Sequence, residues 1–188
     1  VWLEKSALVS VAPMGTFVYA DIEAPFTAST LHVDTEVHNA SCDGATTCQV
    51  RQKLKDATGL VVAQSDLASL TLAAKETTRC RQQFSVANPH LWSTTDPYLY
   101  TVETDVLVDG QVTDTYITRT GIRKVEFDAQ RGFLLNGSPL KLKGVNLHQD
   151  HSGVGAAMPE ALLRYRIKRI KEFGCNAYRS SHNPMTPA

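Results

Sequence analysis

The chain has 188 residues, enough for one or two domains with a substantial hydrophobic core. Its 19 basic and 19 acidic residues cancel, so it lacks the strong field that steers nucleic acid or an anionic membrane surface to a protein. No apolar run approaches the roughly 20 residues that cross a bilayer. Neither nucleic acid nor a membrane is therefore expected as a partner.

Residues 1–128 repeat a pattern of strand, turn and strand. Turn residues recur about every 8–12 positions, and Asp109 with Gly110 is a strong signal for a two-residue hairpin. This spacing predicts an immunoglobulin-like β-sandwich of about seven strands. The runs that alternate apolar and polar positions, as half-buried strands do, include residues 31–37, 48–54, 67–72, 79–86 and 98–108.

The chain contains four cysteines, at positions 42, 48, 80 and 175. Cys42 and Cys48 bracket a short polar loop, and their spacing fits either a small disulfide in an oxidising compartment or two free thiols. No CxxC pair occurs, so no zinc site is predicted. Cys80 and Cys175 are expected to be small buried hydrophobic residues.

Aromatic residues gather near the end of the predicted sandwich, at Trp92, Tyr98 and Tyr100. Their rings could form a platform on which a sugar stacks, or they could pack in the core. Because Pro89 and Pro97 flank the segment within a sandwich strand, core packing is the favoured interpretation.

The pattern changes after residue 128. Asn136 and Gly137 stand between two short apolar runs and favour a tight type I′ hairpin. Residues 141–147 predict a strand, residues 158–174 a helix and residues 176–179 the next strand. A strand, a helix and a strand in about 40 residues predict a βαβ unit with parallel strands. Such a unit is a small part of a complete (β/α)₈ barrel, which needs roughly 250 residues, so the barrel is expected to be incomplete.

The predicted helix has both end signals and an apolar side. Pro159 suits its first turn, and Gly174 suits its C-terminal cap. Its apolar stripe consists of Leu163, Ile167, Ile170 and, more loosely, Phe173. The basic residues between positions 164 and 171 are expected to form a solvated face.

Polar side chains gather where the two predicted strands of the βαβ unit end. His148, Asp150 and His151 follow the first strand, and Arg179 and His182 lie at the end of the second. Active sites of (β/α)₈ barrels are built at the carboxyl ends of their strands. We therefore expect these side chains to lie near one another and to form part of an active-site floor.

Several ordered motifs resemble glycoside hydrolase family 2, which contains β-galactosidases, β-glucuronidases and β-mannosidases. The resemblance is weak between residues 20 and 84, strong thereafter, and specific to the family rather than to one sugar. The motifs are Leu-Trp-Ser-Thr-Thr-Asp-Pro-Tyr-Leu-Tyr (91–100), Thr-Gly-Ile-Arg (120–123), Phe-Leu-Leu-Asn-Gly (133–137), Lys-Gly-Val-Asn-Leu-His (143–148) and Tyr-Arg-Ser-Ser-His-Asn-Pro (178–184).

The resemblance implies a segment of a retaining, exo-acting β-glycosidase, most similar to β-galactosidases, with residues 1–128 as sandwich and residues 129–188 as the start of the catalytic TIM barrel. Retaining enzymes use two carboxylates about 5–5.5 Å apart, one as acid/base and one as nucleophile. In this family both are glutamates of later barrel strands, beyond Ala188. No catalytic residue is therefore assigned, the isolated chain is expected to be inactive, and neither a cofactor nor a metal site is expected.

The resemblance also implies that four residues bind the substrate. His148 matches a histidine that contacts the bound sugar, and His182 matches a second histidine that touches the sugar ring. Asp150 occupies a position where β-glucuronidases and some relatives hold a sugar hydroxyl. Arg179 matches the arginine beside the nucleophile, where a guanidinium can hold a carboxylate ionised. Asn146 and His151 are weaker candidates.

An alternative function is a free-standing immunoglobulin-like module that binds carbohydrate or protein. Such a module would end near residue 128, so the βα tail argues against it. Apolar surface left exposed on an incomplete barrel also predicts self-association through residues beyond about 140. The sequence does not indicate a compartment, and a periplasmic or a cytoplasmic bacterial enzyme would fit it equally.

Overall fold

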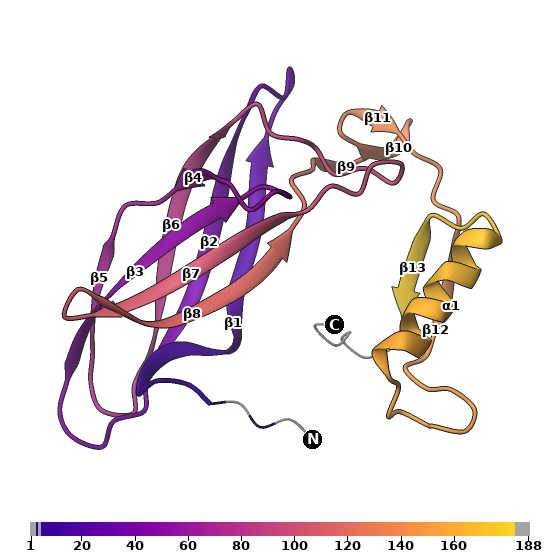
Figure 1. Cartoon of the computed structure of the whole chain (residues 1–188). Coiled ribbons are helices and arrows are strands. Elements are labelled where there is room, and N and C mark those ends of the chain that lie inside the picture. Colours follow the sequence, from indigo (N-terminus) through magenta and orange to yellow (C-terminus); the bar gives the residue numbers. More distant parts are fainter. Residues whose placement is uncertain (1–2, 4, 183–188) are drawn as a thin grey trace. The chain divides into compact units, whose positions relative to one another are not determined.

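A computed structural model describes residue 3 and residues 5–182 (Figure 1). Asn183 and Pro184 of the last motif therefore lie outside the described residues. The chain divides into two compact units, which are described separately below: residues 1–125 with 135–137, and residues 126–134 with 138–188. The domain boundary expected at residue 128 stays a prediction.

The first unit is an antiparallel β-sandwich. Its strands are β1 (Val9–Ile22), β2 (Ala28–Asn39), β3 (Thr46–Lys55), β4 (Val61–Gln64), β5 (Ala68–Leu72), β6 (Thr77–Ala87), β7 (Tyr100–Val108) and β8 (Gln111–Thr120). One sheet has the order β1-β2-β6, and the other has the order β4-β3-β7-β8 with β5 also paired to β3 (Figure 1). The immunoglobulin-like sandwich is thus confirmed, with eight strands among the described residues of this unit.

The strands form where apolar and polar residues alternate, and the turns form where Gly, Asn or Asp can adopt a positive φ. Along β2, Leu31, Val33, Thr35 and Val37 are fully buried while the residues that alternate with them are partly exposed, as the two-residue period of a strand requires. Asp109 and Gly110, with φ of 50° and 74°, connect β7 to β8. Two positive φ values are the signature of a type I′ turn, so this hairpin prediction is confirmed.

The core between the sheets consists of two apolar clusters separated by a polar layer. One cluster includes Val37, Val50 and Val106, and the other includes Val33, Leu54 and Val102. The polar layer consists of Thr35, Gln52, Thr104 and Gln82. Along their own strands, Thr35, Gln52 and Thr104 each stand between a residue of one apolar cluster and a residue of the other.

Hydrogen bonds satisfy this polar layer. The Gln52 side-chain amide donates to Thr35 Oγ1 (3.1 Å) and to Gln82 Oε1 (3.2 Å), and Thr104 Oγ1 donates to Gln52 Oε1 (2.6 Å). The Gln82 amide in turn donates to Ser65 Oγ (2.9 Å). Because a buried polar group without a partner costs stability, this network lets the amide and hydroxyl groups occupy the interior.

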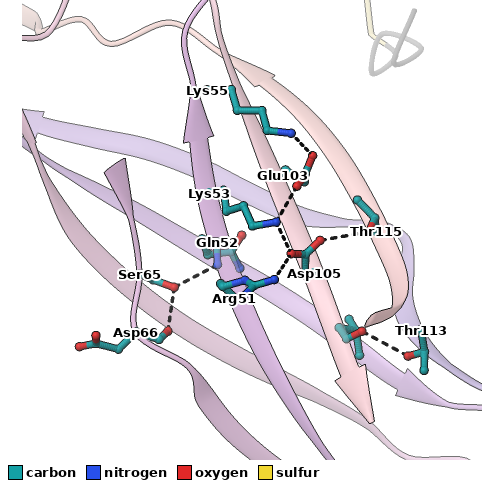
Figure 2. Close-up of polar contacts among 11 residues, drawn as sticks. Arg51, Gln52, Lys53, Lys55, Ser65, Asp66, Glu103, Asp105, Thr113 and Thr115 are labelled. Carbon is teal, nitrogen blue, oxygen red and sulfur yellow. Dashed lines mark hydrogen bonds and ion pairs between the residues drawn. The ribbon is translucent and has the colours of Figure 1, made fainter. Parts of the chain in front are cut away.

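The outer face of the larger sheet carries a ladder of alternating charges (Figure 2). Asp105 lies between Arg51 Nη2 (2.8 Å) and Lys53 Nζ (2.7 Å). Glu103 lies between Lys53 Nζ (3.0 Å) and Lys55. Hydrogen bonds from Lys55 and Lys53 lower the pKa of Glu103 below its ordinary value. The two carboxylates, in turn, raise the pKa of Lys53 through their hydrogen bonds.

Two of the motifs pack against each other in the sandwich. The Trp92 backbone N–H donates to Ile122 O (2.8 Å), and the Arg123 guanidinium carbon lies 5.1 Å from the centre of a Trp92 ring. A Cβ on Gly121 would lie 2.8 Å from that ring, so only glycine fits at this position. Tyr100 is buried and belongs to one apolar cluster, which agrees with the favoured core interpretation.

The cysteines are free thiols in this structure. Cys42 is exposed, whereas Cys48 and Cys80 are buried in the same apolar cluster. Burial raises the pKa of both buried thiols. Cys175 is half-buried rather than buried, contrary to expectation.

The second unit contains the predicted strand, helix and strand. Its elements are β9 (Val125–Asp128) and β10 (Gly132–Leu135), each of which has one end residue in the first unit, and β11 (Ser138–Pro139), β12 (Gly144–Leu147), α1 (Glu160–Glu172) and β13 (Ala177–Ser180). β12 and β13 pair in parallel, and α1 lies between them in sequence, so the βαβ prediction is confirmed. Asn136 and Gly137, with φ of 50° and 74°, make the predicted type I′ turn between β10 and β11.

Helix α1 ends in a Schellman motif. Gly174 has a φ of 81°, and its N–H donates to Lys171 O (2.9 Å) while the Cys175 N–H donates to Ile170 O (3.2 Å). Gly174 thus follows the C-cap residue, Phe173, and does not itself occupy the C-cap. No helix among the described residues is long and apolar enough to span a membrane.

The apolar stripe of α1 is shorter than expected. Leu163, Ile167 and Ile170 are half-buried, as the sequence predicts. The inclusion of Phe173 is wrong, because this residue follows the last helical turn and is 87% exposed.

Candidate functional site

The candidate site lies at the carboxyl ends of the parallel pair β12–β13. In the register of this pair, Asn146 lies opposite Arg179 and Leu147 opposite Ser180. Both strands end at this point, so the chain leaves the sheet at the same edge on each. His148 is the first residue after β12, and His182 is the second residue after β13.

The structure brings the two histidines together. The ring centroids of His148 and His182 are 5.4 Å apart, with 51° between the ring planes. His182 has a φ of 66°, an uncommon backbone conformation for a residue with a side chain. Both side chains are exposed, so a ligand can reach the edge that they share.

The other two predicted site residues are Arg179, near the end of β13, and Asp150, in the loop that follows β12. Arg179 is exposed within β13, and its register partner Asn146 lies on the same face of the strand pair. Asp150 is exposed in the loop after β12, and its backbone carbonyl accepts a hydrogen bond from Arg166 Nη1 (2.7 Å). This bond connects the loop to α1.

His151 has a structural environment within the same loop. Its Nδ1 lies 2.9 Å from Ser152 O, and its backbone forms an isolated antiparallel bridge with Gly155. The His151 N–H donates to Gly155 O (3.1 Å) as part of this bridge. These contacts explain His151 as a residue that shapes the loop.

A small pocket adjoins His148. Its volume is about 50 Å³, and it is lined by His148, Gln149, Ala156, Met158, Leu163, Arg166 and Tyr178. Sites for small molecules usually have roughly 300–1,000 Å³, so this pocket is smaller than a complete sugar site.

Sequence reasoning missed Gln149, Arg166 and Tyr178 as neighbours of His148. Arg166 carried a signal, because it follows Leu163 by three residues and so shares the apolar side of the helix. A cation on that side needs a polar partner, and in the structure it finds the loop carbonyl of Asp150.

The two glutamates of α1 are not placed as a catalytic pair. Glu160 forms an ion pair with Arg164 (2.5 Å), and Glu172 forms one with Arg169 (2.6 Å). They are the first and last residues of the 13-residue α1. At 1.5 Å per residue they are about 18 Å apart along the helix axis, against roughly 5–5.5 Å in retaining glycosidases. Among the described residues, no three His, Cys, Asp or Glu side chains form a group that could hold a metal ion.

Comparison with known protein families identifies the chain. The model described as glycosyl hydrolases family 2 matches residues 13–123, which is more than half of the chain. The TIM barrel domain of the same family matches residues 125–188, which contain β12, α1 and β13. The chain belongs to glycosyl hydrolases family 2. Its fold is therefore the immunoglobulin-like sandwich of this family followed by the start of the TIM-barrel domain.

Individual members of glycosyl hydrolases family 2 are similar over most of the chain. The β-galactosidase BoGH2A of Bacteroides ovatus is 36% identical over 100% of this chain and 22% of its own length. A β-glucuronidase of Formosa agariphila is 32% identical over 93% of this chain and 18% of its own length. A crystal structure of a family 2 member from Bacteroides cellulosilyticus superposes with a TM-score of 0.85 and 32% identity, covering 95% of this chain and 24% of that one.

The comparisons show relatives of two activities, β-galactosidase and β-glucuronidase. This chain spans about a fifth of the length of the curated relatives it matches. The family and the hydrolase nature of the relatives are therefore shown, whereas the role of each site residue stays a prediction.

Proposed function

We propose that this chain is a segment of a retaining, exo-acting β-glycosidase that hydrolyses β-galactosides. The observation that carries the proposal is the convergence of His148 and His182 at the carboxyl ends of β12 and β13. That edge lies in the part of the chain matched by the TIM barrel domain of the family, and barrel enzymes place their active sites at this end of the strands.

In this proposal four side chains bind the sugar and orient the catalytic groups. The ring nitrogens of His148 and His182 form hydrogen bonds with hydroxyl groups on one side of the pyranose. Asp150 accepts a hydrogen bond from a further hydroxyl. Arg179 presents a guanidinium fork that keeps the nucleophilic carboxylate ionised and fixes its orientation.

The proposal also holds that the isolated chain is inactive. Residues 129–188 contain three carboxylates, Asp150, Glu160 and Glu172. Both glutamates are paired with arginines on α1 and are too far apart to act together. An assay of the purified chain with p-nitrophenyl β-galactoside tests this, with the Bacteroides ovatus β-galactosidase as positive control. Hydrolysis above the buffer rate that scales with chain concentration contradicts the proposal.

The site assignment is tested in the longer protein of which we propose this chain to be a segment. His148→Ala and His182→Ala are each expected to lower kcat/KM for an aryl β-galactoside by about 100-fold, because misplacing a substrate by an ångström can cost this much. His38→Ala, whose histidine contacts Thr77 on the sandwich, is the matched control and is expected to change kcat/KM little. An unchanged kcat/KM in both site variants contradicts the assignment.

The sugar is tested by comparing aryl β-galactoside with aryl β-glucuronide on that longer protein. The proposal of a β-galactosidase rests on the β-galactosidase relative that matches the whole chain. A higher kcat/KM for the glucuronide than for the galactoside contradicts the proposal of a β-galactosidase. The assignment to glycosyl hydrolases family 2 does not depend on this result. The alternative of a free-standing binding module is disfavoured by the match of residues 125–188 to a catalytic-domain model.

We further propose that the isolated chain self-associates through residues beyond about 140. Leu142, Val145 and Phe173 of this unit are exposed apolar side chains. Size-exclusion chromatography of the chain is compared with that of a version ending at Phe127. Identical monomeric elution of the two contradicts self-association through this region.

A further inference from the structure

The outer face of the sheet β1-β2-β6 carries two exposed aromatic rings. Phe17 is 64% exposed and Tyr19 is 42% exposed, and both point outward from β1. Their register partners on β2 are Asp34 and His32. We call the surface of these four residues, with Glu36 and Arg79, the aromatic face.

A bulge in β1 is what turns these rings outward. Val9 and Val11 face the core before the bulge, whereas Val18 and Ile22 face the core after it. The register with β2 shifts between Val11 and Thr16, so the inward positions change from odd to even numbers. Without this shift the odd-numbered Phe17 and Tyr19 would face the core. Bulges of this kind re-aim side chains and occur beside functional sites.

The backbone of the bulge is specialised. Met14 has a φ of 54° and is exposed, an uncommon conformation for a residue with a side chain. A Cβ on Gly15 would lie 2.7 Å from Ala12 O, so only glycine allows the chain to turn here. Strained backbone of this kind persists where the surrounding structure fixes it and is concentrated at binding sites.

Neighbouring side chains hold the Tyr19 ring in place. Its centroid lies 4.6 Å from that of His32, with 5° between the planes, and 5.4 Å from that of Phe17. His32 Nε2 in turn lies 2.9 Å from Asp21 Oδ2. A ring that is fixed before a ligand arrives loses little conformational freedom on binding.

A polar hollow adjoins Phe17 on the same face. Its volume is about 230 Å³, and it is lined by Met14, Gly15, Thr16, Phe17, Asp34, Glu36 and Arg79. Carboxylate and guanidinium groups in its wall are the hydrogen-bonding groups that recognise hydroxyls. The hollow thus joins an apolar ring to several polar groups, the combination that small-molecule sites use.

The two carboxylates of this face, Asp34 and Glu36, each have an arginine partner. Glu36 pairs with Arg79 Nη2 (2.7 Å), and Asp34 lies 3.5 Å from Arg81 Nε. The paired charges leave no strong field of one sign, so the surface is complementary to an uncharged ligand rather than to an anionic one.

We propose that the aromatic face binds a neutral oligosaccharide, with Phe17 and Tyr19 stacking against successive sugar rings and the hollow receiving hydroxyl groups. A sugar ring has apolar C–H faces and hydroxyl groups at its edges. The aromatic rings can contact the former, and the polar groups of the hollow can bind the latter. The inference goes beyond the glycosidase function, because it concerns the sandwich and uses none of the residues at the ends of β12 and β13. Tyr100, one of the aromatic residues singled out in the sequence, packs in the core instead.

The test titrates the whole chain with neutral galactotetraose and cellotetraose, followed by NMR chemical shifts. At least one of the two is expected to bind, with the shifted resonances centred on Phe17 and Tyr19. The double variant Phe17→Ala/Tyr19→Ala is expected to weaken binding about ten-fold or more through the loss of both rings. Phe173→Ala removes another exposed ring and is the matched control, with binding unchanged. The single variant Phe17→Ala provides the same test with a smaller change if the double variant does not fold.

Several results overturn the inference. They are the absence of binding for both oligosaccharides, equal binding by the double variant, and equal or tighter binding of anionic tetragalacturonate. Loss of self-association in the folded double variant, without any effect on sugar binding, would assign the face to a protein partner.

The variant His148→Ala/His182→Ala separates this inference from the glycosidase function. Loss of binding there, with full binding by Phe17→Ala/Tyr19→Ala, would place the sugar at the barrel site and overturn the inference.

Discussion

Replacing Asp105 with asparagine is expected to destabilise the sandwich by about 2 kcal/mol at pH 7. The Asp105 side chain is only 3% exposed and receives hydrogen bonds from Arg51 (2.8 Å), Lys53 (2.7 Å) and Thr115 (3.1 Å) (Figure 2). Asparagine keeps the shape of the side chain and can still bond Thr115. It removes the charge, however, and leaves two cations without that partner.

The magnitude follows from how far these cations can reach water. Removing one partner of a fully buried ion pair costs about 3–5 kcal/mol. Arg51 and Lys53 retain 29% and 23% of their side-chain exposure, and Lys53 keeps its bond to Glu103. Solvent therefore recovers part of the loss, which reduces the expected cost to about 2 kcal/mol.

The pH dependence of the unfolding free energy gives a second readout. Burial raises the pKa of Asp105, but hydrogen bonds from Lys53, Arg51 and Thr115 outweigh burial and leave the pKa below its ordinary value. A carboxyl group with a lowered pKa contributes stability above its unfolded pKa of about 3.9, and this contribution is lost as the pH falls through the folded pKa. Asp105→Asn is therefore expected to lose less stability on acidification than the unmodified chain.

Urea denaturation followed by tryptophan fluorescence at pH 7 and at lower pH measures both effects. Asp34→Asn is the matched control, since its carboxylate keeps 24% of its side-chain exposure and lies 3.5 Å from a partner, Arg81, that is 74% exposed. This control is expected to cost at most about 1 kcal/mol. Equal destabilisation by the two variants, or a steeper loss of stability at low pH in Asp105→Asn, would refute the reasoning.

Three further substitutions test other parts of the structure. Gly121→Ala is expected to cost about 2 kcal/mol by urea denaturation, because its Cβ would lie 2.8 Å from the Trp92 ring; an unchanged midpoint would contradict that contact. Gln52→Leu is expected to cost about 3 kcal/mol in the same assay, because two buried threonine hydroxyls lose their partner. Gly174→Ala is expected to cost about 1 kcal/mol by thermal denaturation followed by helical circular dichroism, because its φ is 81°.

The sandwich could be predicted largely from local patterns. Alternation over residues 31–37 and 48–54 lies within β2 and β3, and the two turns with positive φ follow from their Asp-Gly and Asn-Gly chemistry. The long strand β1 was not predicted. Pro13 and Gly15 interrupt its alternation, and the structure accommodates them in a bulge that sequence periodicity alone does not reveal.

The candidate site could be predicted as far as the ends of the two strands. A parallel pair joined by a helix brings its carboxyl ends to one edge, so the proximity of His148 and His182 follows from the βαβ pattern. The spacing of Arg166 from Leu163 indicates only that it lies on the apolar side of α1, and the contacts that Arg166 and Tyr178 make at the site could not be predicted. They depend on how α1 is rotated about its own axis against the strands, which packing decides.

The aromatic residues show the same limit on the sandwich. Core packing was the favoured interpretation for the aromatic residues near the end of the sandwich, and Tyr100 does pack in the core. Phe17 and Tyr19 passed unnoticed because their outward direction depends on a change of phase at the bulge. Which face of the sheet a side chain occupies depends on the register between its strand and the neighbouring strand. That register depends on both strands and is not contained in the sequence of one of them.

The thiols of the sandwich allow transient separation of its two sheets to be measured by alkylation. The thiolate is the form that an alkylating reagent attacks, and burial both shields Cys48 and Cys80 and disfavours their ionisation. Cys42 is exposed and will be modified at once, so it calibrates the reagent within the same molecule. Modification of the other two then requires the sheets to separate. When the sheets close again faster than the reagent reacts, the modification rate gives the free energy of that separation without any denaturant.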